Sequence, residues 1–239
     1  MQNFYRMVDI NKHKFYLFQI LKEIYEDKEL AITLGFKGGT ALMFFYDLPR
    51  FSVDLDFNLL NPAKEEMAYG KVREILLKHG TIHDEAKKFY GPLCVLDYGA
   101  GERKLKVEIS NRNFNDLYEV KNLLGVTMQV MVAPDMFAHK LCAMLDRTVM
   151  TNRDIFDCWF FMHNKTLLNK AIVETRMGMP LVDYLQKGID TLEGMSDKGL
   201  LNGLGELMDE TMKKFVRSKL RSETITLLKF YQQFPLLVE

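Results

Sequence analysis

The spacing of hydrophobic and polar residues changes along the chain and separates a mixed N-terminal part from a helical C-terminal part. Residues 11–29 place hydrophobic side chains at three- and four-residue steps, which predicts an amphipathic helix. Alternating or β-branched runs predict six strands, at residues 32–36, 52–60, 82–90, 92–98, 103–110 and 126–133. The turn sequence Gly-Ala-Gly at 99–101 joins two of these strands as a hairpin.

Further helices are expected where helix formers follow a capping or turn residue. They cover residues 40–48 with Thr40 as the cap, 61–80 ending at Gly80, 134–147 with Pro134 in the first position, and 153–164. From about residue 165 the pattern is almost wholly helical, with glycines interrupting it at 193–207. We therefore expect an α+β fold. A small mixed sheet flanked by helices occupies residues 1–133, and a helical region, 134–239, completes the active-site cleft.

Composition limits the classes of protein that fit. The 239 residues are 48% hydrophobic, which suffices for a sizeable core. Lysine plus arginine equals aspartate plus glutamate, 32 against 32. This balance excludes a broad cationic surface for nucleic acid but leaves room for a local basic groove.

Location is predicted from what the sequence lacks. The start of the chain has no signal-peptide pattern, and no run approaches the roughly 18 apolar residues of a membrane span. Cys94, Cys142 and Cys158 show no metal-binding spacing and are odd in number, so we interpret them as buried thiols in a reducing compartment. We expect a soluble cytoplasmic protein that does not bind a membrane.

The strand containing Asp54-Leu55-Asp56 carries the first candidate chemistry. Side chains alternate along a strand, so both aspartates point to one face, with Cα atoms roughly 6.6 Å apart. Such a pair suits Mg²⁺, which prefers hard oxygen ligands and one or two protein carboxylates. An isolated pair is also typical of an amphipathic strand whose polar face lies in water.

Gly38 and Gly39 precede these aspartates and strengthen the interpretation. Glycine allows backbone N–H groups to approach a phosphate, and the helix that follows directs its positive end to the same place. The alternative is a tight turn between strand and helix. Together with Asp54 and Asp56, the glycines predict one compact metal and phosphate site.

Glu108 is the candidate third carboxylate. Val107 and Ile109 alternate away from it, so it reaches the same cleft if its strand neighbours that of the aspartates. Lys106 shares its face and is expected to neutralise phosphate or pair with Glu108. The alternative for both residues is a solvated strand face.

Later charged residues have both functional and structural interpretations. Lys140 is a candidate phosphate ligand or a solvated lysine, and it lies roughly 140° around the helix from Asp135. Asp154 and Asp157 are neighbours on one helical face, where they orient Lys140 or the substrate, or form a structural ion-pair cluster.

Arg50 and Ser52 are weaker candidates close to the first aspartate. Arg50 offers a forked donor set to a phosphate, or holds Asp47 or Asp54 in place. Trp159 and the two phenylalanines after it fit a helical core better than a binding site, and so do the methionines at 128, 131 and 136.

These motifs resemble the AbiEii/AbiGii toxin family of nucleotidyltransferases, which belongs to the DNA polymerase beta-like superfamily. The resemblance begins with Lys37-Gly38-Gly39-Thr40-Ala41-Leu42 and Arg50-Phe51-Ser52-Val53-Asp54-Leu55-Asp56-Phe57. It continues with the strand around Glu108, with Asp135 and Lys140, and with residues 153–157. The superfamily more often has Gly-Ser at the turn, and Gly-Gly is typical of the AbiEii group. The matched motifs span residues 37–157, about half of the chain.

The resemblance implies a Mg²⁺-dependent (or Mn²⁺-dependent) enzyme that moves NMP from an NTP to an acceptor and releases pyrophosphate. Asp54, Asp56 and Glu108 are then the metal ligands and, with Lys140, the catalytic residues. The implied nucleotide-binding residues are Lys37, Gly38, Gly39, Thr40, Arg50, Ser52, Asp154 and Asp157.

The resemblance also implies a biological role. Family members are toxins of toxin–antitoxin or abortive-infection systems, so a cognate antitoxin is an expected partner and tRNA an expected acceptor. A basic run in the C-terminal helix offers a local patch for RNA or a solvated face: Lys213, Lys214, Arg217, Lys219 and Arg221. Two alternatives stay open, a nucleotidyltransferase for a small sugar or antibiotic, and a nucleotide- or partner-binding module without turnover.

Overall fold

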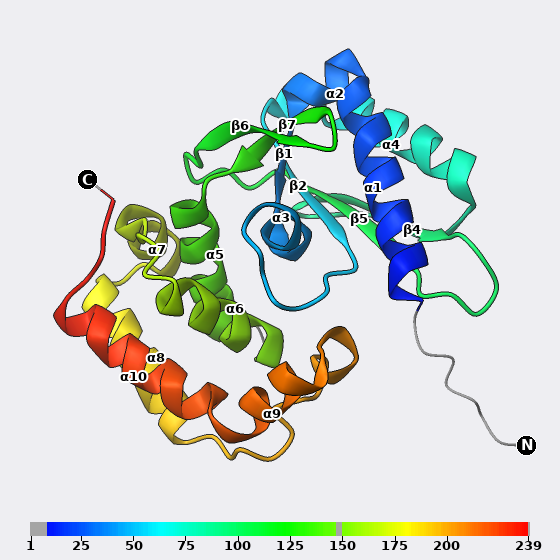
Figure 1. Cartoon of the computed structure of the whole chain (residues 1–239). Coiled ribbons are helices and arrows are strands. Elements are labelled where there is room, and N and C mark those ends of the chain that lie inside the picture. Colours follow the sequence, from blue (N-terminus) through cyan, green and yellow to red (C-terminus); the bar gives the residue numbers. More distant parts are fainter. Residues whose placement is uncertain (1–8, 147–149, 239) are drawn as a thin grey trace, which may run out of the picture. The chain divides into compact units, whose positions relative to one another are not determined.

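The computed structural model describes residues 9–146 and 150–238, which divide into two compact units (Figure 1). The first unit contains the described residues up to Asp47 together with Phe51–Asn113 and Tyr118–Met131. The second contains Leu48–Arg50, Phe114–Leu117 and the described residues from Val132 onward. The chain therefore leaves the first unit and returns to it twice before the second unit continues without interruption.

A seven-stranded mixed sheet organises the first unit. Its order is β3-β4-β5-β2-β1-β7-β6. The strands are β1 (Leu34–Lys37), β2 (Leu55–Leu59), β3 (Thr81–Lys88), β4 (Gly91–Asp97), β5 (Leu105–Ser110), β6 (Tyr118–Leu123) and β7 (Val126–Met131). β2 pairs in parallel with β5 and β1 with β7, whereas the other neighbours are antiparallel. The expected α+β fold with a mixed sheet is confirmed.

Four helices accompany the sheet in the first unit: α1 (Ile10–Glu26), α2 (Lys28–Thr33), α3 (Gly38–Phe45) and α4 (Glu65–His79), the last preceded by a 3₁₀ turn at Pro62–Lys64. The single helix predicted over 11–29 is in fact two. Asp27 ends α1, and its carboxylate accepts hydrogen bonds from the N–H groups of Glu29 and Leu30, which starts α2.

α1 and α4 lie side by side and cover one face of the sheet (Figure 1). The Tyr25 ring of α1 lies 6.3 Å from that of Phe57 on β2, and its hydroxyl donates to the backbone oxygen of Leu34. Leu55, Phe57, Val107 and Ile109 are all buried. Because strand side chains alternate, this apolar face leaves the opposite face to the acidic residues of β2 and β5.

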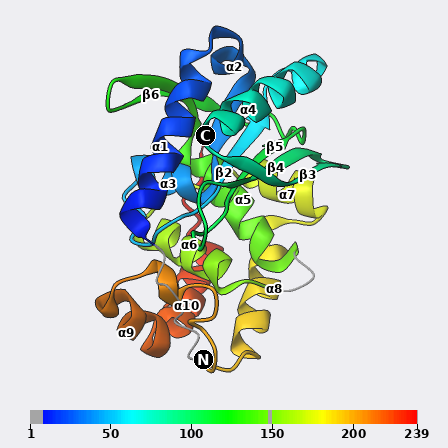
Figure 2. The same ribbon diagram turned by 90° about the vertical axis from the view of Figure 1, so that its right-hand side faces the viewer.

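The second unit is helical. It contains α5 (Ala133–Asp146), α6 (Asn152–His163), α7 (Lys170–Met177), α8 (Leu181–Glu193), α9 (Glu210–Ser218) and α10 (Leu220–Gln233), with a 3₁₀ turn at Gly205–Leu207. α10 packs against α6 and α8 (Figure 2). The Tyr184 hydroxyl of α8 donates to the backbone oxygens of Leu141 and Cys142 at the end of α5. The glycine-containing segment between α8 and α9 interrupts the helices as expected.

Some sequence expectations need correction at the level of elements. β6 was not predicted: three of its six side chains are exposed and the other three are half-buried, so none marks a core position. Pro134 is the second residue of α5, and Arg147, the last residue of that predicted helix, lies outside the described chain. Residues 1–8, where the absence of a signal peptide was expected, lie outside it too.

The expected packing residues are confirmed as core. Trp159 and both following phenylalanines are buried in α6, and the methionines at 128, 131 and 136 are buried as well. All three cysteines are buried free thiols.

Gly91 gives a test of the sheet. Its φ is +110°, and an added Cβ would collide with the backbone oxygen of Ile109. We expect Gly91→Ala to lower the free energy of unfolding by about 2 kcal/mol or more, because neither the backbone angle nor the space suits a side chain. Urea unfolding measures the change.

Gly70→Ala is the matched control. Gly70 lies in α4, and a Cβ there would meet nothing within 4 Å. Alanine should stabilise this helix by about 0.5–1 kcal/mol. Equal effects of the two substitutions would contradict the strain assigned to Gly91.

Candidate active site

The register of the sheet brings Asp56 and Glu108 side by side. β2 and β5 run parallel with Asp56 opposite Glu108, and on the other side of β2 Lys37 of β1 lies opposite Asp56. Partners in register project to the same face of a sheet. The predicted adjacency of the two strands is therefore present, and one lysine and two carboxylates follow each other across three strands.

Gly38 lies against the Asp56 carboxylate. Its φ is +79°, and an added Cβ would lie 2.5 Å from Asp56 Oδ2. Any larger residue would displace the carboxylate and strain the backbone. α3 begins at Gly38, and within the described chain no side chain caps it, so its first N–H groups keep their capacity to bind an anion beside Asp56.

Asp54 immediately precedes β2 and is held by its neighbours. The backbone N–H of Lys106 donates to Asp54 Oδ1 at 3.4 Å, and the Thr40 hydroxyl donates to the backbone oxygen of Asp54. The prediction that Thr40 caps the helix is wrong. α3 starts two residues earlier with Lys37 as its N-cap, and Thr40 is buried inside the helix, where it fixes the Asp54 segment.

His13 of α1 supports the same segment and was missed by sequence reasoning. Its Nε2 donates to the backbone oxygen of Val53 at 2.8 Å, and its Nδ1 accepts from the Tyr98 hydroxyl at 2.6 Å, a tautomer assigned from these partners. Burial lowers the pKa of His13, so the ring is neutral at pH 7. No local pattern distinguishes it from a surface histidine of an amphipathic helix.

Lys106 balances the acidic face. Its Nζ lies 2.9 Å from Glu108 Oε2. Burial disfavours the charged lysine, but the carboxylates of Asp56 and Glu108 outweigh burial and raise the pKa of Lys106 above its ordinary value. In the same way burial acts to raise the pKa of Glu108, and the charge of Lys106 overcomes it, so the pKa of Glu108 is lowered. At neutral pH, both groups are charged.

The carboxylates do not form a ready-made metal cage. Among residues 9–146 and 150–238, no group of three or more histidine, cysteine or acidic side chains is arranged to hold a metal ion. Asp56 and Glu108 are direct neighbours across β2 and β5. Asp54 lies two residues before Asp56, where its carboxylate contacts the backbone N–H of Lys106. Carboxylate oxygens are of the ligand type that Mg²⁺ prefers, and Mg²⁺ commonly combines one or two protein carboxylates with phosphate oxygens of a substrate.

The second unit contains a buried ion cluster built around Asp157. The Arg50 guanidinium contacts both carboxylate oxygens of Asp157, each at 2.7 Å, and Lys140 Nζ lies 2.8 Å from Asp157 Oδ2. The side chains of Asp157 and Arg50 are 0% and 3% exposed, whereas Lys140 is 18% exposed. Of the three, Lys140 has most access to solvent.

These cations control the ionisation of the cluster. Burial opposes the ionisation of Asp157, but the charges of Arg50 and Lys140 outweigh it and lower the pKa of Asp157 to about 2. Burial likewise opposes the charge on Lys140, and Asp157 and Asp154 reverse the effect and raise the pKa of Lys140.

Asp154 lies in the first turn of α6, next to the N-cap Thr151, and faces Lys140. The Thr151 hydroxyl donates to Asp154 Oδ2 at 2.7 Å, and Asp154 Oδ1 lies 3.6 Å from Lys140 Nζ. Asp154 is buried, as is Ser52 in the segment before β2 of the first unit. Asp154 therefore lies both in the first turn of α6 and beside Lys140.

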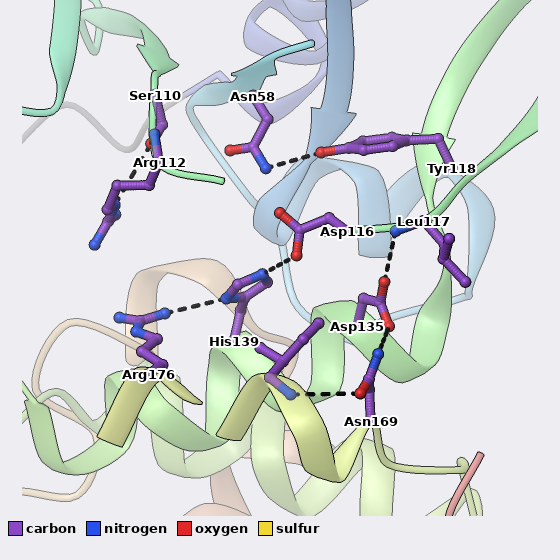
Figure 3. A network of polar contacts seen from close by, with 11 residues as sticks. Asn58, Ser110, Arg112, Asp116, Leu117, Tyr118, Asp135, His139, Asn169 and Arg176 are labelled. Carbon is purple, nitrogen blue, oxygen red and sulfur yellow. Dashed lines mark hydrogen bonds and ion pairs between the residues drawn. The ribbon is translucent and has the colours of Figure 1, made fainter. Parts of the chain in front are cut away.

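Asp135 has a role separate from Lys140, as their angular separation suggested. Its two carboxylate oxygens accept from the backbone N–H of Leu117 and from Asn169 Nδ2, each at 2.7 Å (Figure 3). This carboxylate ties the start of α5 to two other segments of the second unit.

His139 lies at the centre of a second polar group that the sequence did not reveal. Its Nε2 donates to Asp116 at 2.6 Å, and its Nδ1 accepts from Arg176 at 3.2 Å (Figure 3). The lone pair that a general base would need is therefore engaged by a guanidinium. The three residues come from segments far apart in sequence, and no spacing motif links them.

Residues 19–179 match a family described as nucleotidyl transferase AbiEii toxin, type IV toxin–antitoxin system. The chain belongs to the AbiEii family. It is a nucleotidyltransferase of the toxin type, which confirms the resemblance drawn from the glycine and aspartate motifs.

Solved structures share the fold of this AbiEii protein at low identity. MenT4, a nucleotidyltransferase toxin from Mycobacterium tuberculosis H37Rv, is 17% identical, with a TM-score of 0.62 over 97% of this chain and 89% of MenT4. JHP933 from Helicobacter pylori is 20% identical, with a TM-score of 0.57 over 95% of this chain and 93% of JHP933. No curated protein matches the chain in sequence. None of the described helices has the length and apolar character needed to cross a membrane.

Asp157→Asn tests the buried ion cluster. The substitution leaves Arg50 and Lys140 without a full counter-charge, so we expect the free energy of unfolding at pH 7 to fall by about 3–5 kcal/mol. The exposed Asp183→Asn in α8 is the control and should change it by less than about 1 kcal/mol.

The decrease of the free energy of unfolding at acidic pH gives a second test of the Asp157→Asn variant. Because the pKa of Asp157 is about 2 in the folded chain and near 4 when unfolded, its stabilisation is present above pH 4 and is lost as the pH falls towards 2. Urea unfolding between pH 7 and pH 2 should show a shallower acid loss in Asp157→Asn. An unchanged acid slope would contradict the assignment.

Proposed function

We propose that this nucleotidyltransferase uses Mg²⁺ to transfer NMP from an NTP to an RNA acceptor, with a tRNA end as the target. The observation that carries the proposal is the row of Lys37, Asp56 and Glu108 across three strands, with the start of α3 against Asp56. A helix start beside two carboxylates suits a triphosphate together with a divalent cation.

Asp54, Asp56 and Glu108 are the proposed metal ligands. Their oxygens match the preference of Mg²⁺ or Mn²⁺, and the remaining ligands would come from the phosphates of the NTP. A bound metal would neutralise charge on the reacting phosphates and on the leaving pyrophosphate. Metal binding that requires the phosphates of bound NTP agrees with the arrangement of the described carboxylates, which do not enclose a metal by themselves.

The phosphate-binding role falls to the turn between β1 and α3. Gly38 and Gly39 let the first N–H groups of α3 approach the β- and γ-phosphates, and Lys37 adds a positive charge next to Asp56. Thr40 contributes by holding the Asp54 segment. The acceptor oxygen bonds to the α-phosphorus, the bond to the β-phosphate oxygen breaks, and pyrophosphate leaves.

Glu108 is proposed for the acceptor side of the reaction. It is separated from Gly38 by Asp56 and so lies on the far side of the carboxylate pair from the phosphate-binding turn. There it either holds a metal or accepts the proton of the attacking hydroxyl. Lys106 keeps its carboxylate oriented through their ion pair.

In the second unit we assign Lys140 to the neutralisation of phosphate charge. Arg50, Asp154 and Asp157 were predicted as nucleotide ligands, and their burial and mutual contacts favour a positioning role for them. Lys140 keeps partial access to solvent and a raised pKa, so it offers a permanent positive charge.

The family supports the proposed biology. A type IV toxin–antitoxin system contains an antitoxin, so we expect a cognate antitoxin to counteract this chain. We place the activity in the cytoplasm, where NTPs and tRNA are available. A toxin that modifies tRNA ends would stop translation.

The acceptor is identified by direct labelling. The protein is incubated with Mg²⁺, total cellular RNA and each radiolabelled NTP in turn, and the products are separated on a gel. We expect label in RNA of tRNA size from one preferred NTP. Label in a small product, or none with any NTP, would overturn the RNA assignment.

Asp56→Asn and Glu108→Gln test the catalytic face. Each should lower the rate of nucleotide transfer by more than about 100-fold, because each removes a charge at the reacting phosphate. Thermal unfolding should show both folds intact. Asp183→Asn, an exposed aspartate on α8 of the second unit, is the control and should keep full turnover. A Glu108→Gln enzyme with normal turnover would refute its place in the reaction.

Lys140→Met separates a role in substrate binding from a role in stability. We expect a rise of about 10-fold or more in the KM for NTP, since one phosphate contact by a charged group is lost. Loss of folding together with an unchanged KM at low temperature would instead assign Lys140 to the ion cluster alone.

A further inference from the structure

The row of Lys37, Asp56 and Glu108 marks the proposed active face of the sheet. This row continues beyond Glu108 to the edge of the sheet. Glu108 lies opposite Leu93 of β4, and Leu93 lies opposite Ala86 of β3. The full row, from the phosphate-binding end to the edge, is Lys37, Asp56, Glu108, Leu93 and Ala86. On the side of Glu108 away from the phosphate-binding turn, β4 and β3 therefore form the surface next to the proposed site.

Lys88 extends this face by one positive charge. It follows Ala86 by two residues on β3 with no irregularity between them, so both side chains project to the face of Glu108. The charge of Lys88 also contributes to the lowered pKa of Glu108, after the larger effects of burial, Lys106 and Lys37. A cation thus stands at the end of β3, on the same face as the carboxylates.

Two exposed aromatic rings follow Lys88 in the turn between β3 and β4. Phe89 is 89% exposed, the largest value among the large hydrophobic side chains of the described chain, and Tyr90 is 53% exposed. The rings meet edge to face, with centroids 4.9 Å apart. Two adjacent exposed aromatic residues have no role in the core.

Arg112 and the backbone fix this turn next to the end of β5. The Arg112 guanidinium lies over the Tyr90 ring, 4.7 Å from its centroid. Arg112 Nε contacts Ser110 Oγ at 3.5 Å (Figure 3). The N–H of Asn111 donates to the backbone oxygen of Tyr90 at 3.1 Å. The aromatic turn is thereby attached to the strand that carries Glu108.

We propose that the Phe89–Tyr90 turn, with Lys88 and Arg112, is a platform that binds the single-stranded end of the nucleic-acid acceptor beside Glu108. The inference deepens the proposed function and rests on it for the identity of the reaction. Unpaired bases stack on aromatic rings and guanidinium planes, and nearby lysines and arginines contact the phosphates. About 10 Å, two strand spacings, separates β3 from Glu108. The platform therefore holds a nucleotide close to the reacting end, not the reacting nucleotide itself.

The chemistry of the turn favours nucleic acid over a protein partner. Its two rings are flanked by Lys88 and Arg112, which complement phosphate. The other edge of the sheet ends in the turn between β6 and β7, where the exposed side chain is the aliphatic Leu124. In the basic run of the second unit, Lys213 pairs with Glu210 and Arg221 with Asp197, which reduces its net charge. A neutral chain needs a local RNA site, and the turn supplies one.

Phe89→Ala and Tyr90→Ala test the platform in the full chain. Binding of a short fluorescent single-stranded RNA is measured by anisotropy without NTP or metal. Each variant should weaken binding by at least about 5-fold, because one stacked base contributes roughly 5- to 150-fold to affinity. In the transfer assay the KM for RNA should rise and the KM for NTP should stay unchanged.

Leu124→Ala is the matched control, since it removes an equally exposed side chain, 80% exposed, from the turn at the opposite edge. It should alter RNA binding by less than about 2-fold. In a plot of the logarithm of RNA affinity against the logarithm of salt concentration, Lys88→Gln should make the slope shallower by about one.

The outcomes separate this inference from the proposed function. Unchanged RNA affinity in both aromatic variants overturns the platform even if transfer to RNA proceeds, and a protein partner would then be the better occupant. A rise in the KM for NTP instead of RNA also overturns it. Platform-dependent RNA binding without any transfer supports the platform and refutes the proposed reaction. Wild-type protein that does not bind single-stranded RNA refutes the platform outright.

Discussion

The parallel pairing of β2 with β5 is the constraint on which the active face depends. It places Asp56 directly beside Glu108, and two adjacent carboxylates repel each other. Lys106 offsets this repulsion through its ion pair with Glu108. The register is fixed by the opposite face of the sheet, because Leu55, Phe57 and Val107 are buried there and Phe57 packs near Tyr25 of α1. A slip by one residue would turn the carboxylates into that apolar layer, so the core of the first unit also fixes the geometry of the site.

The second unit uses charge in a different way. Asp157 lies between Arg50 and Lys140 with no exposed surface, so its charge is matched inside the protein and not by solvent. Buried pairs of this kind add little net stability over apolar packing, but the loss of one partner is costly. The arrangement therefore acts through position: it holds one lysine charged and partly accessible at a defined point on α5. On the active face of the first unit, in contrast, Lys106 and Glu108 keep about a third of their surface exposed and are available to a substrate.

Local patterns predicted the parts of the site that alternation or a turn determines. The projection of Asp56 and Glu108 to one face and the need for Gly38 follow from the period of a strand and the conformation of glycine, whereas β2 begins only at Leu55 and Asp54 precedes it. Contacts between distant segments left no such signal. Arg50 meets Asp157 across 107 positions, and His13 meets Val53 across 40. Thr40 was misassigned for the same reason: its hydroxyl is used by Asp54 and not by its own helix.

The order of residues across the sheet gives the site a direction, which family membership alone does not provide. Solved relatives at 17% and 20% identity establish the fold, and residue roles must come from this chain's own register. From Lys37 to Ala86 the row crosses four strand spacings, about 19 Å, with the helix start at one end and the aromatic turn beyond the other. That length accommodates a triphosphate and part of an acceptor without overlap. Because the two ends carry different chemistry, N–H groups at one and aromatic rings at the other, the proposed site would bind two unlike substrates from opposite ends, with Asp56 and Glu108 between them.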